Sequence, residues 1–339
     1  MRARIGSLLR RNDVLVALTI VAFCVFTGVQ APSFFTLGNL FDLLRASIVL
    51  GIFAIGVLVV LVSGGIDVSF TAIAAFSMYT TTLYLTQSGF DGHWILAFGI
   101  SMLIGLGLGL INAFFIGVFR LPTMIVTLGT LSLFRGFMLA WIGSRLISQL
   151  PSSMREFSRT NLFRFTSDDG VIHSLPIAIL FLVGVVLITW FILNRTMLGR
   201  AIYAMGGSTV AAERAGFSIT WLQVFVYAYV GALAGLAGII HASMARVANP
   251  SDLVGLELTV IAAVVLGGAR LTGGHGSILG TLLGVALIVI ISNSLVVLGV
   301  PSYWQRVVIG LLILLGTGIP AYQARRAQRH MYSDTGGGA

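Results

Sequence analysis

Long runs of apolar residues, separated by short polar or glycine-rich stretches, follow one another along almost the whole chain. A helix needs about 20 apolar residues, at about 1.5 Å each, to cross roughly 30 Å of hydrocarbon. The pattern therefore predicts an all-α polytopic membrane protein with about ten transmembrane helices, one or more of them broken or re-entrant. The expected spans are 13–30, 44–63, 68–87, 93–119, 122–143, 175–193, 218–243, 257–269, 276–298 and 302–320.

Composition supports the same class of protein and excludes others. Of 339 residues, 57% are hydrophobic and 9% are charged, whereas a soluble domain has about 25% charged residues. All twenty basic residues are arginine, which excludes a P-loop that needs lysine and a Schiff-base lysine. With one cysteine, Cys24, and five scattered histidines, we expect no intrachain disulfide, no metal site, no cofactor and no nucleic-acid partner.

Charge placement predicts how the chain lies in the membrane. With ten crossings, twelve arginines fall on one side and five on the other. By the positive-inside rule, this predicts that both termini are cytoplasmic. The N-terminal stretch resembles a signal peptide, but Pro32 after the expected cleavage site favours an uncleaved first helix.

Two polar segments divide the predicted transmembrane domain. The expected divisions are a cytoplasmic tail at 1–12, a transmembrane domain at 13–320 and a cytoplasmic tail at 321–339. The outer segment, 144–174, is polar; it could cap the protein or receive a partner, or be a solvated loop.

The inner segment, 194–217, carries helix signals. Ser208 is a good N-cap, residues 209–215 favour helix, and Gly216 suits a left-handed C′ position. Such a two-turn helix is too short to be stable alone in water. It therefore requires a surface to lie against, which could be the membrane, other helices or another protein.

Four stretches together resemble one family. They are the inner segment, residues 63–69 (SGGIDVS), residues 121–130 (LPTMIVTLGT), and the glycine-rich region of 257–284. In this order, over roughly 35–320, they resemble ABC-type sugar importer permeases of the ribose, galactofuranose and autoinducer group.

The resemblance implies a permease subunit in the bacterial cytoplasmic membrane, surrounded by lipid. It implies three partners: a separate ABC ATPase, a periplasmic solute-binding protein, and a second permease copy, identical or not. The same architecture could instead carry nucleosides or branched-chain amino acids. An ion-coupled carrier or an intramembrane enzyme is less favoured, since the spans hold few acids, essentially Asp42, Asp67 and Glu257.

In the resemblance, the inner segment corresponds to the loop that couples to the ATPase. Small residues at 211, 212 and 215 would let a partner's cleft close tightly, while Glu213 and Arg214 could pair across an interface; a solvated connector is the alternative. The coupling residues that we predict are Gly199, Arg200, Gly206, Gly207, Ser208, Ala211, Ala212, Glu213, Arg214 and Gly216.

Polar residues within apolar runs are candidates for the translocation path. Asp67 could face the path or fix the loop and cap the next helix. Arg135 lies near mid-span, where a charge costs at least about 2.5–3.5 kcal/mol. The path candidates, each of which could be an interhelical hydrogen bond instead, are Asp67, Ser69, Asn112, Thr127, Arg135 and Asn293.

Glycine clusters predict where helices break. Residues 64–69 and 267–276 are alike, and we interpret the likeness as local glycine usage rather than an inverted repeat, because both would lie on the same side. The predicted break or re-entrant glycines are Gly64, Gly65, Gly267, Gly268, Gly273, Gly274 and Gly276.

Overall fold

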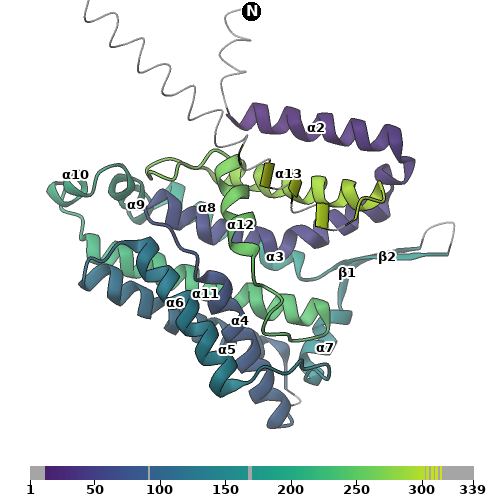
Figure 1. Cartoon of the computed structure of the whole chain (residues 1–339), viewed down its shortest axis with the longest axis horizontal. Helices are drawn as coiled ribbons and strands as arrows, with labels where there is room; N and C mark the ends of the chain where they lie inside the picture. The colour runs from purple at the N-terminus through teal and green to yellow at the C-terminus, as the bar shows by residue number, and fades with distance from the viewer. Residues whose placement is uncertain are drawn as a thin grey trace, which may run out of the picture.

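The computed structural model describes residues 12–314 except 91, 167–169, 302, 305, 306, 309, 312 and 313. It is a bundle of helices with one small hairpin (Figure 1). The helices are α2 (Asn12–Gln30), α3 (Leu37–Val62), α4 (Phe70–Gln87), α5 (Trp94–Ala113), α6 (Thr123–Phe137), α7 (Ser152–Arg159), α8 (Ile179–Arg195), α9 (Met197–Gly207), α10 (Thr209–Arg214), α11 (Ile219–Ala245), α12 (Leu256–Leu266) and α13 (Ile278–Val297). The remaining elements are the 3₁₀ turn η1 (Pro32–Phe35), the π-helical turns η2 (Phe114–Val118) and η3 (Met138–Ile142), and strands β1 (Asn161–Thr166) and β2 (Ile172–Pro176).

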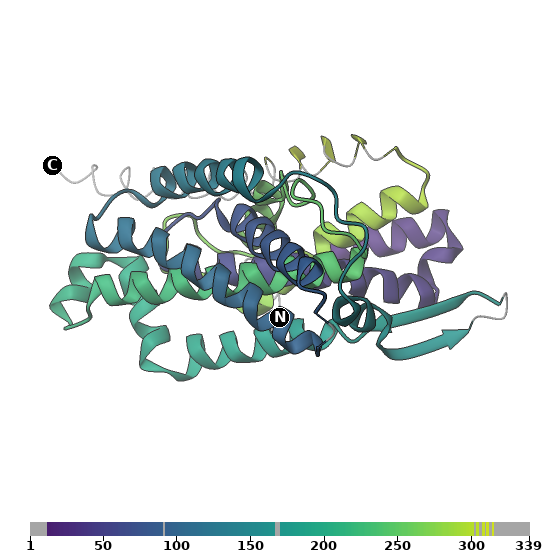
Figure 2. The ribbon, with the colours of Figure 1, turned by 90° about the horizontal axis from the view of Figure 1, so that it is seen from below.

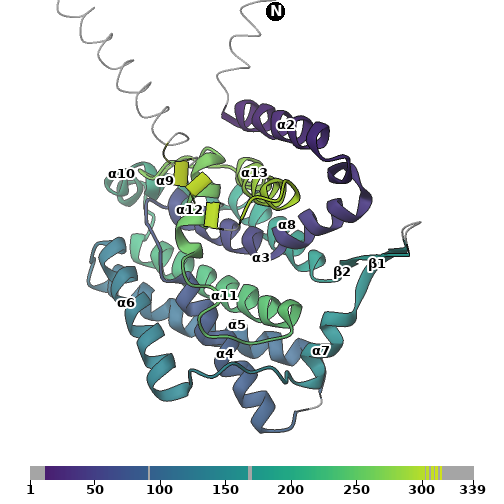
Figure 3. The ribbon, with the colours of Figure 1, turned by 45° about the vertical axis from the view of Figure 1, so that its right-hand side comes forward.

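Helix α11 lies at the centre and packs against α3, α4 and α5 (Figure 3). Its seam with α5 is built from small residues: a Cβ on Gly105 or Gly109 would strike the α11 backbone, and one on Gly231 would strike α5. Ser101 Oγ also donates to the Gly235 carbonyl at 2.7 Å. Small residues four apart let membrane helices approach closely, so this seam is the tight core of the bundle.

A second group of helices surrounds α13, which packs against both α2 and α3. Large apolar side chains on α2 and α8 point away from the protein, including Leu18, Phe26, Leu187 and Phe191, all more than half exposed. Such surfaces are unfavourable in water and suit a lipid environment.

Five helical segments are long and apolar enough to cross a membrane within the part of the chain that the structure describes. They are Leu37–Val62, Trp94–Val118, Thr123–Ile142, Ile219–Ala245 and Ile278–Val297. Helices α8 and α9, bent by 75°, add a sixth if they count as one span. This supports a helical polytopic membrane protein.

The predicted count of about ten spans stays a prediction. The apolar part of α2 and the eleven-residue α12 are short. Helix α4 fills the expected span at 68–87 but is rich in threonine and mostly buried inside the protein. The expected span at 302–320 lies largely outside the described residues.

The polar segment 144–174 is folded rather than an extended loop. Strands β1 and β2 pair antiparallel, with Arg164 opposite Ser174, and the hairpin projects from one end of the molecule (Figure 2). Helix α7 is anchored by Phe157, whose ring centroid is 4.7 Å from that of Phe98. The hairpin and α10 lie at opposite ends of the bundle (Figure 1), which we call the hairpin end and the α10 end.

Candidate functional site

The predicted short helix is present as α10 and begins as its sequence indicates. Ser208 is in an extended conformation, and its side chain accepts a hydrogen bond from the Ala211 N–H at 3.2 Å. Gly216 has a φ of +88°, which glycine adopts without the strain that a Cβ would bring. Local capping thus fixes both ends of this helix, as predicted.

One side of α10 is held by the protein and the other is free. Ala212 is 1% exposed and packs into the body, whereas Ala211, Glu213 and Arg214 are exposed. Val210 is 57% exposed. Neither charged side chain forms an ion pair with another described residue, so α10 presents a small, charged and partly apolar surface.

The helix that leads into α10 is fixed in a similar way. Thr196 caps α9, accepting a hydrogen bond from Gly199 N–H at 3.2 Å, and a Cβ on Gly199 would strike the backbone of α8. Gly199 therefore permits the sharp bend between the two helices. Arg200 is exposed on α9, and its guanidinium contacts Met197 on the same helix.

Glycines from three distant segments meet where α9 ends. A Cβ on Gly206 would strike the Val62 carbonyl at the end of α3, and a Cβ on Gly273 would lie 2.7 Å from Gly64 Cα. Gly274 N–H donates to the Val62 carbonyl at 2.9 Å. We call the meeting point of Gly64, Gly206, Gly273 and Gly274 the glycine junction. Backbone lies directly on backbone there, without intervening side chains.

Tyr203, which the sequence analysis did not single out, strengthens this junction. Its hydroxyl donates to the Gly276 carbonyl at 2.8 Å, joining α9 to the loop between α12 and α13. This glycine-rich loop, residues 267–277, contains five of the seven predicted break glycines. Gly267 and Gly268 end α12, and a Cβ on Gly267 would strike α13 at Gly280.

The predicted break at residues 63–69, the break loop, joins α3 to α4 and is held by α6. Ile66 N–H donates to Thr123 Oγ1 at 3.0 Å, and Thr127 Oγ1 donates to the Ile66 carbonyl at 3.2 Å. Gly64 has a φ of +85°. A Cβ on Gly65 would lie 2.6 Å from the Tyr227 hydroxyl. The glycines therefore allow both the turn and the close approach of α11.

Three of the path candidates form one hydrogen-bonded chain that joins the break loop to α5. Asp67 Oδ1 accepts from the Ser69 N–H and from the Ser69 Oγ, each at 2.7 Å. Asn112 Nδ2 on α5 donates to Ser69 Oγ, also at 2.7 Å. All three are buried. Ser69 stands at the N-cap position of α4 but makes no capping hydrogen bond with its side chain. The Asp67 carboxylate accepts from the backbone of Ser69 and Phe70 at the start of α4, which agrees with the loop-fixing and capping role considered for it.

The remaining path candidates lie apart from this chain. Arg135 is half-buried in the last turn of α6 and has no ion pair within the described ranges. Asn293 lies on α13, where its Oδ1 has no described hydrogen-bond partner. The structure therefore brings together Asp67, Ser69, Asn112 and Thr127, but neither Arg135 nor Asn293.

A polar link that sequence reasoning missed joins α4 to α12, and another lies at the hairpin end. Thr71 Oγ1 on α4 donates to the carboxylate of Glu257 on α12.

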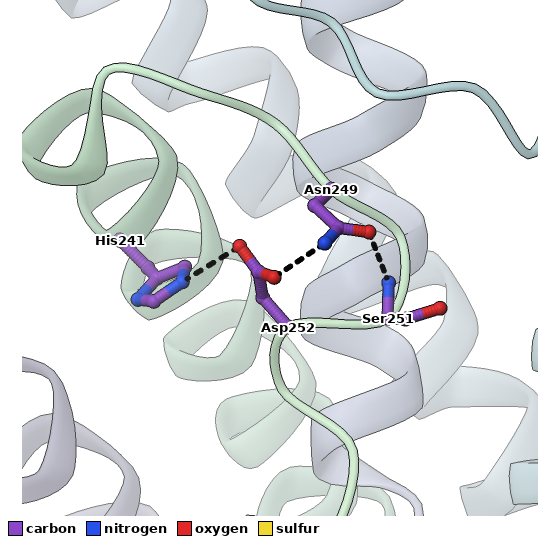
Figure 4. A network of polar contacts seen from close by, with 4 residues as sticks. All are labelled: His241, Asn249, Ser251 and Asp252. Carbon is purple, nitrogen blue, oxygen red and sulfur yellow. Dashed lines mark hydrogen bonds and ion pairs between the residues drawn. The ribbon is translucent and has the colours of Figure 1, made fainter.

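At the hairpin end, Asp252 accepts from Asn249 Nδ2 at 2.6 Å and lies 3.6 Å from His241 Nε2 (Figure 4). Within the described ranges, no three His, Cys, Asp or Glu side chains gather closely enough to hold a metal ion.

The chain is similar to known import permeases over most of its length. Residues 39–316 match the family described as branched-chain amino acid transport system / permease component. The ribose import permease protein RbsC of Escherichia coli is 33% identical over 309 residues, 91% of this chain and 92% of that protein. RbsC of Bacillus subtilis is 35% identical over 293 residues, 86% and 87% of the two chains. The autoinducer 2 import system permease protein LsrC of Yersinia enterocolitica is 32% identical over 297 residues, 88% and 79%. No solved structure matches the chain.

The apolar helices are those of a multi-pass membrane protein, and the comparisons assign the chain to the permease class. The chain belongs to the family of ABC-type import permeases that these comparisons identify. The resemblance predicted from the sequence is thereby confirmed.

Proposed function

We propose that this chain is the membrane-spanning subunit of an ABC importer that carries a sugar or sugar-like solute into the cytoplasm. A separate ATPase drives it, a periplasmic binding protein delivers the solute, and two permease copies flank the path. Both termini and α10 face the cytoplasm in this proposal. The similarity to ribose and autoinducer 2 import permeases supports the solute class.

The observation that carries the proposal is the connection of α10 to both helix breaks. Helix α10 is exposed on one side, and α9 before it contacts the break loop and the glycine-rich loop through the glycine junction. A partner that pushes on α10 would therefore push on both breaks at once. Rigid-body tilting of the attached helices is a known way to convert such a displacement into alternate access.

The hydrogen-bonded chain at Asp67 gives the break loop a defined shape. Asp67, Ser69, Asn112 and Thr127 are buried and mostly bonded to one another or to backbone. We propose that they hold the closed arrangement of the break loop and become accessible to the path when it opens. Arg135 and Asn293 are proposed to face the path directly, because each is a polar group within a membrane helix with no described acceptor or donor to satisfy it.

The test is solute uptake by proteoliposomes that contain the chain, an ABC ATPase subunit and a solute-binding protein. Uptake should require all three proteins and ATP, and the purified chain alone should hydrolyse no ATP. Uptake by the chain alone, driven by an ion gradient, would identify an ion-coupled carrier instead. Competition by a panel of sugars, nucleosides and branched-chain amino acids would identify the solute class.

A second candidate keeps the architecture and changes the solute. The family's description names branched-chain amino acids, and the few polar groups of the break loop do not by themselves select a sugar. If branched-chain amino acids or nucleosides compete for uptake and sugars do not, this alternative replaces the first proposal.

A further inference from the structure

Four arginines from four different elements line one cavity at the hairpin end. Arg45 lies on α3, Arg159 ends α7, Arg164 lies on β1, and Arg246 directly follows α11. The cavity has a volume of about 180 Å³, and we call it the arginine cavity. These residues are separated by up to 201 positions in the sequence, so the fold, not local composition, places them together.

The nearest carboxylates by sequence, Glu156 on α7 and Asp42 on α3, lie outside the lining of the arginine cavity. Its lining contains no aspartate or glutamate among the described residues. The one ion pair found in the described part of the chain, between His241 and Asp252, lies elsewhere. Arg246 Nε donates to Ser158 Oγ at 3.2 Å, which holds that side chain toward α7. Like charges around a small cavity repel one another, and an anion placed between them removes that repulsion.

The backbone at Arg246 is unusual. Its φ is +57°, in the left-handed region that normally favours glycine at the end of a helix. A non-glycine residue in that region costs about 1–3 kcal/mol, and such strain gathers at binding sites. Arg120 adopts the same conformation elsewhere in the chain, with a φ of +53°, but Arg246 combines it with a side chain that lines the arginine cavity.

The depth of the cavity agrees with the level of lipid head groups. Helix α3 has 26 residues and is therefore about 39 Å long, longer than the roughly 30 Å hydrocarbon core. Arg45 lies eight residues beyond Leu37, about 12 Å from the hairpin end of α3. Arg246 follows the last residue of the 27-residue α11. Arg246 therefore lies near the boundary between hydrocarbon and head groups, and Arg45 lies about 7–8 Å inside it, a depth from which a long arginine side chain can extend to the head-group level.

We propose that the arginine cavity binds the phosphate of an anionic phospholipid. Guanidinium groups match phosphate oxygens with two parallel hydrogen bonds each, and the Ser174 hydroxyl lies in the same lining. The side chain of Met244 provides an apolar surface for the first carbons of the acyl chains. The proposal requires only that the chain spans a membrane; it does not depend on transport or on which leaflet faces the hairpin end.

Native mass spectrometry of the purified full chain tests the proposal, with phosphatidylglycerol or phosphatidylcholine added in equal amounts. The wild-type chain should retain phosphatidylglycerol preferentially. The Arg45→Gln/Arg164→Gln variant should retain at least about tenfold less, since hydrogen bonds to charged groups are among the stronger ones. Arg164→Gln alone, on the projecting hairpin, guards against a folding defect and should also reduce retention.

The matched control is Arg155→Gln, an exposed arginine of α7 that does not line the arginine cavity. Its retention of phosphatidylglycerol should equal that of the wild type. Equal retention of both lipids, or equal loss in the control and the cavity variants, would overturn the proposal. Displacement of the lipid by inorganic phosphate, or by an acidic solute-binding protein, would assign the cavity to a free anion or to a protein partner and would also overturn it.

Discussion

The two ends of the molecule are held together in different ways. At the α10 end, backbone touches backbone where Gly206 meets Val62 and where Gly273 meets Gly64. At the hairpin end, aromatic side chains such as the rings of Phe98 and Phe157 pack together, and backbone hydrogen bonds rather than glycine contacts join Ile147 to Ala248. Close-packed contacts transmit displacement because they compress little, whereas side chains can change rotamer. In the proposed function, this difference means that the α10 end passes on movement and the hairpin end holds its shape.

The largest effect should come from reversing charge on α10. We expect Glu213→Arg to abolish uptake while the protein stays folded in the membrane, because Glu213 is exposed, forms no ion pair with another described residue and, in the proposed function, belongs to the surface that meets the ATPase. Deletion of residues 209–215 should also abolish uptake and leave the protein folded in the membrane. Uptake in the reconstituted system and thermal unfolding in detergent are the two measurements.

The matched control reverses the same charge at the other end. Glu156→Arg, exposed on α7, should leave uptake close to that of the wild type. Normal uptake by Glu213→Arg, or equal losses at the two positions, would show that α10 is no docking surface.

Two adjacent glycines give the next test. Gly206→Ala places a methyl group against the Val62 carbonyl, whereas the same change at Gly207 meets nothing within 4 Å. We expect Gly206→Ala to lower stability by about 1–3 kcal/mol, as overpacking does, and to reduce uptake severely. Gly207→Ala should leave both nearly unchanged. If the two variants behave alike in the uptake assay, the glycine junction has no special role.

Removing one tyrosine hydroxyl at each end of the molecule tests the same comparison, with a smaller expected effect on uptake and stability. Tyr203 donates to Gly276 at the α10 end, and Tyr79 donates to the Arg145 carbonyl at 2.9 Å at the hairpin end. Phenylalanine at either position removes one hydrogen bond, worth about 0.5–1.5 kcal/mol of stability. We expect both variants to unfold at lower temperature, and only Tyr203→Phe to slow uptake, by roughly twofold to tenfold. A matching loss of uptake in Tyr79→Phe would remove the distinction between the ends.

The smallest effect is expected for the charge of Asp252. Asp252→Asn keeps an oxygen that can accept from Asn249 and removes only the attraction to His241, 3.6 Å away and partly exposed. Pairs of this kind contribute about 0–1 kcal/mol. The unfolding temperature and the uptake rate should therefore stay close to those of the wild type. A severe loss of uptake at an unchanged unfolding temperature would show that the hairpin end takes part in coupling.

The sequence predicted what depends on neighbouring residues. Ser208 and Gly216 bound α10 through capping rules that span a few positions, so that helix could be found from sequence alone. The family was also recognisable, because its motifs occur in order along the chain.

Contacts between distant segments could not be predicted in the same way. The likeness between 64–69 and 267–276 indicated local glycine usage, yet Gly64 and Gly273 lie against each other. Nothing near Tyr203 in the sequence points to Gly276, 73 residues away. Likewise, the four arginines of the arginine cavity come from separate elements, and only the packing of those elements brings them to one place.

The most direct test of the account measures whether α10 and the glycine-rich loop move as one body. Spin labels are placed, in a Cys24→Ala background, at the exposed positions Val210 and Leu271, and in a second variant at Val210 and Phe163 on the hairpin. Distances are compared in the complex with its ATPase before and after ATP binding. The account predicts that the distance from Val210 to Leu271 stays constant while the distance from Val210 to Phe163 changes. A changing distance from Val210 to Leu271, with Leu271 fixed relative to the hairpin, would contradict it.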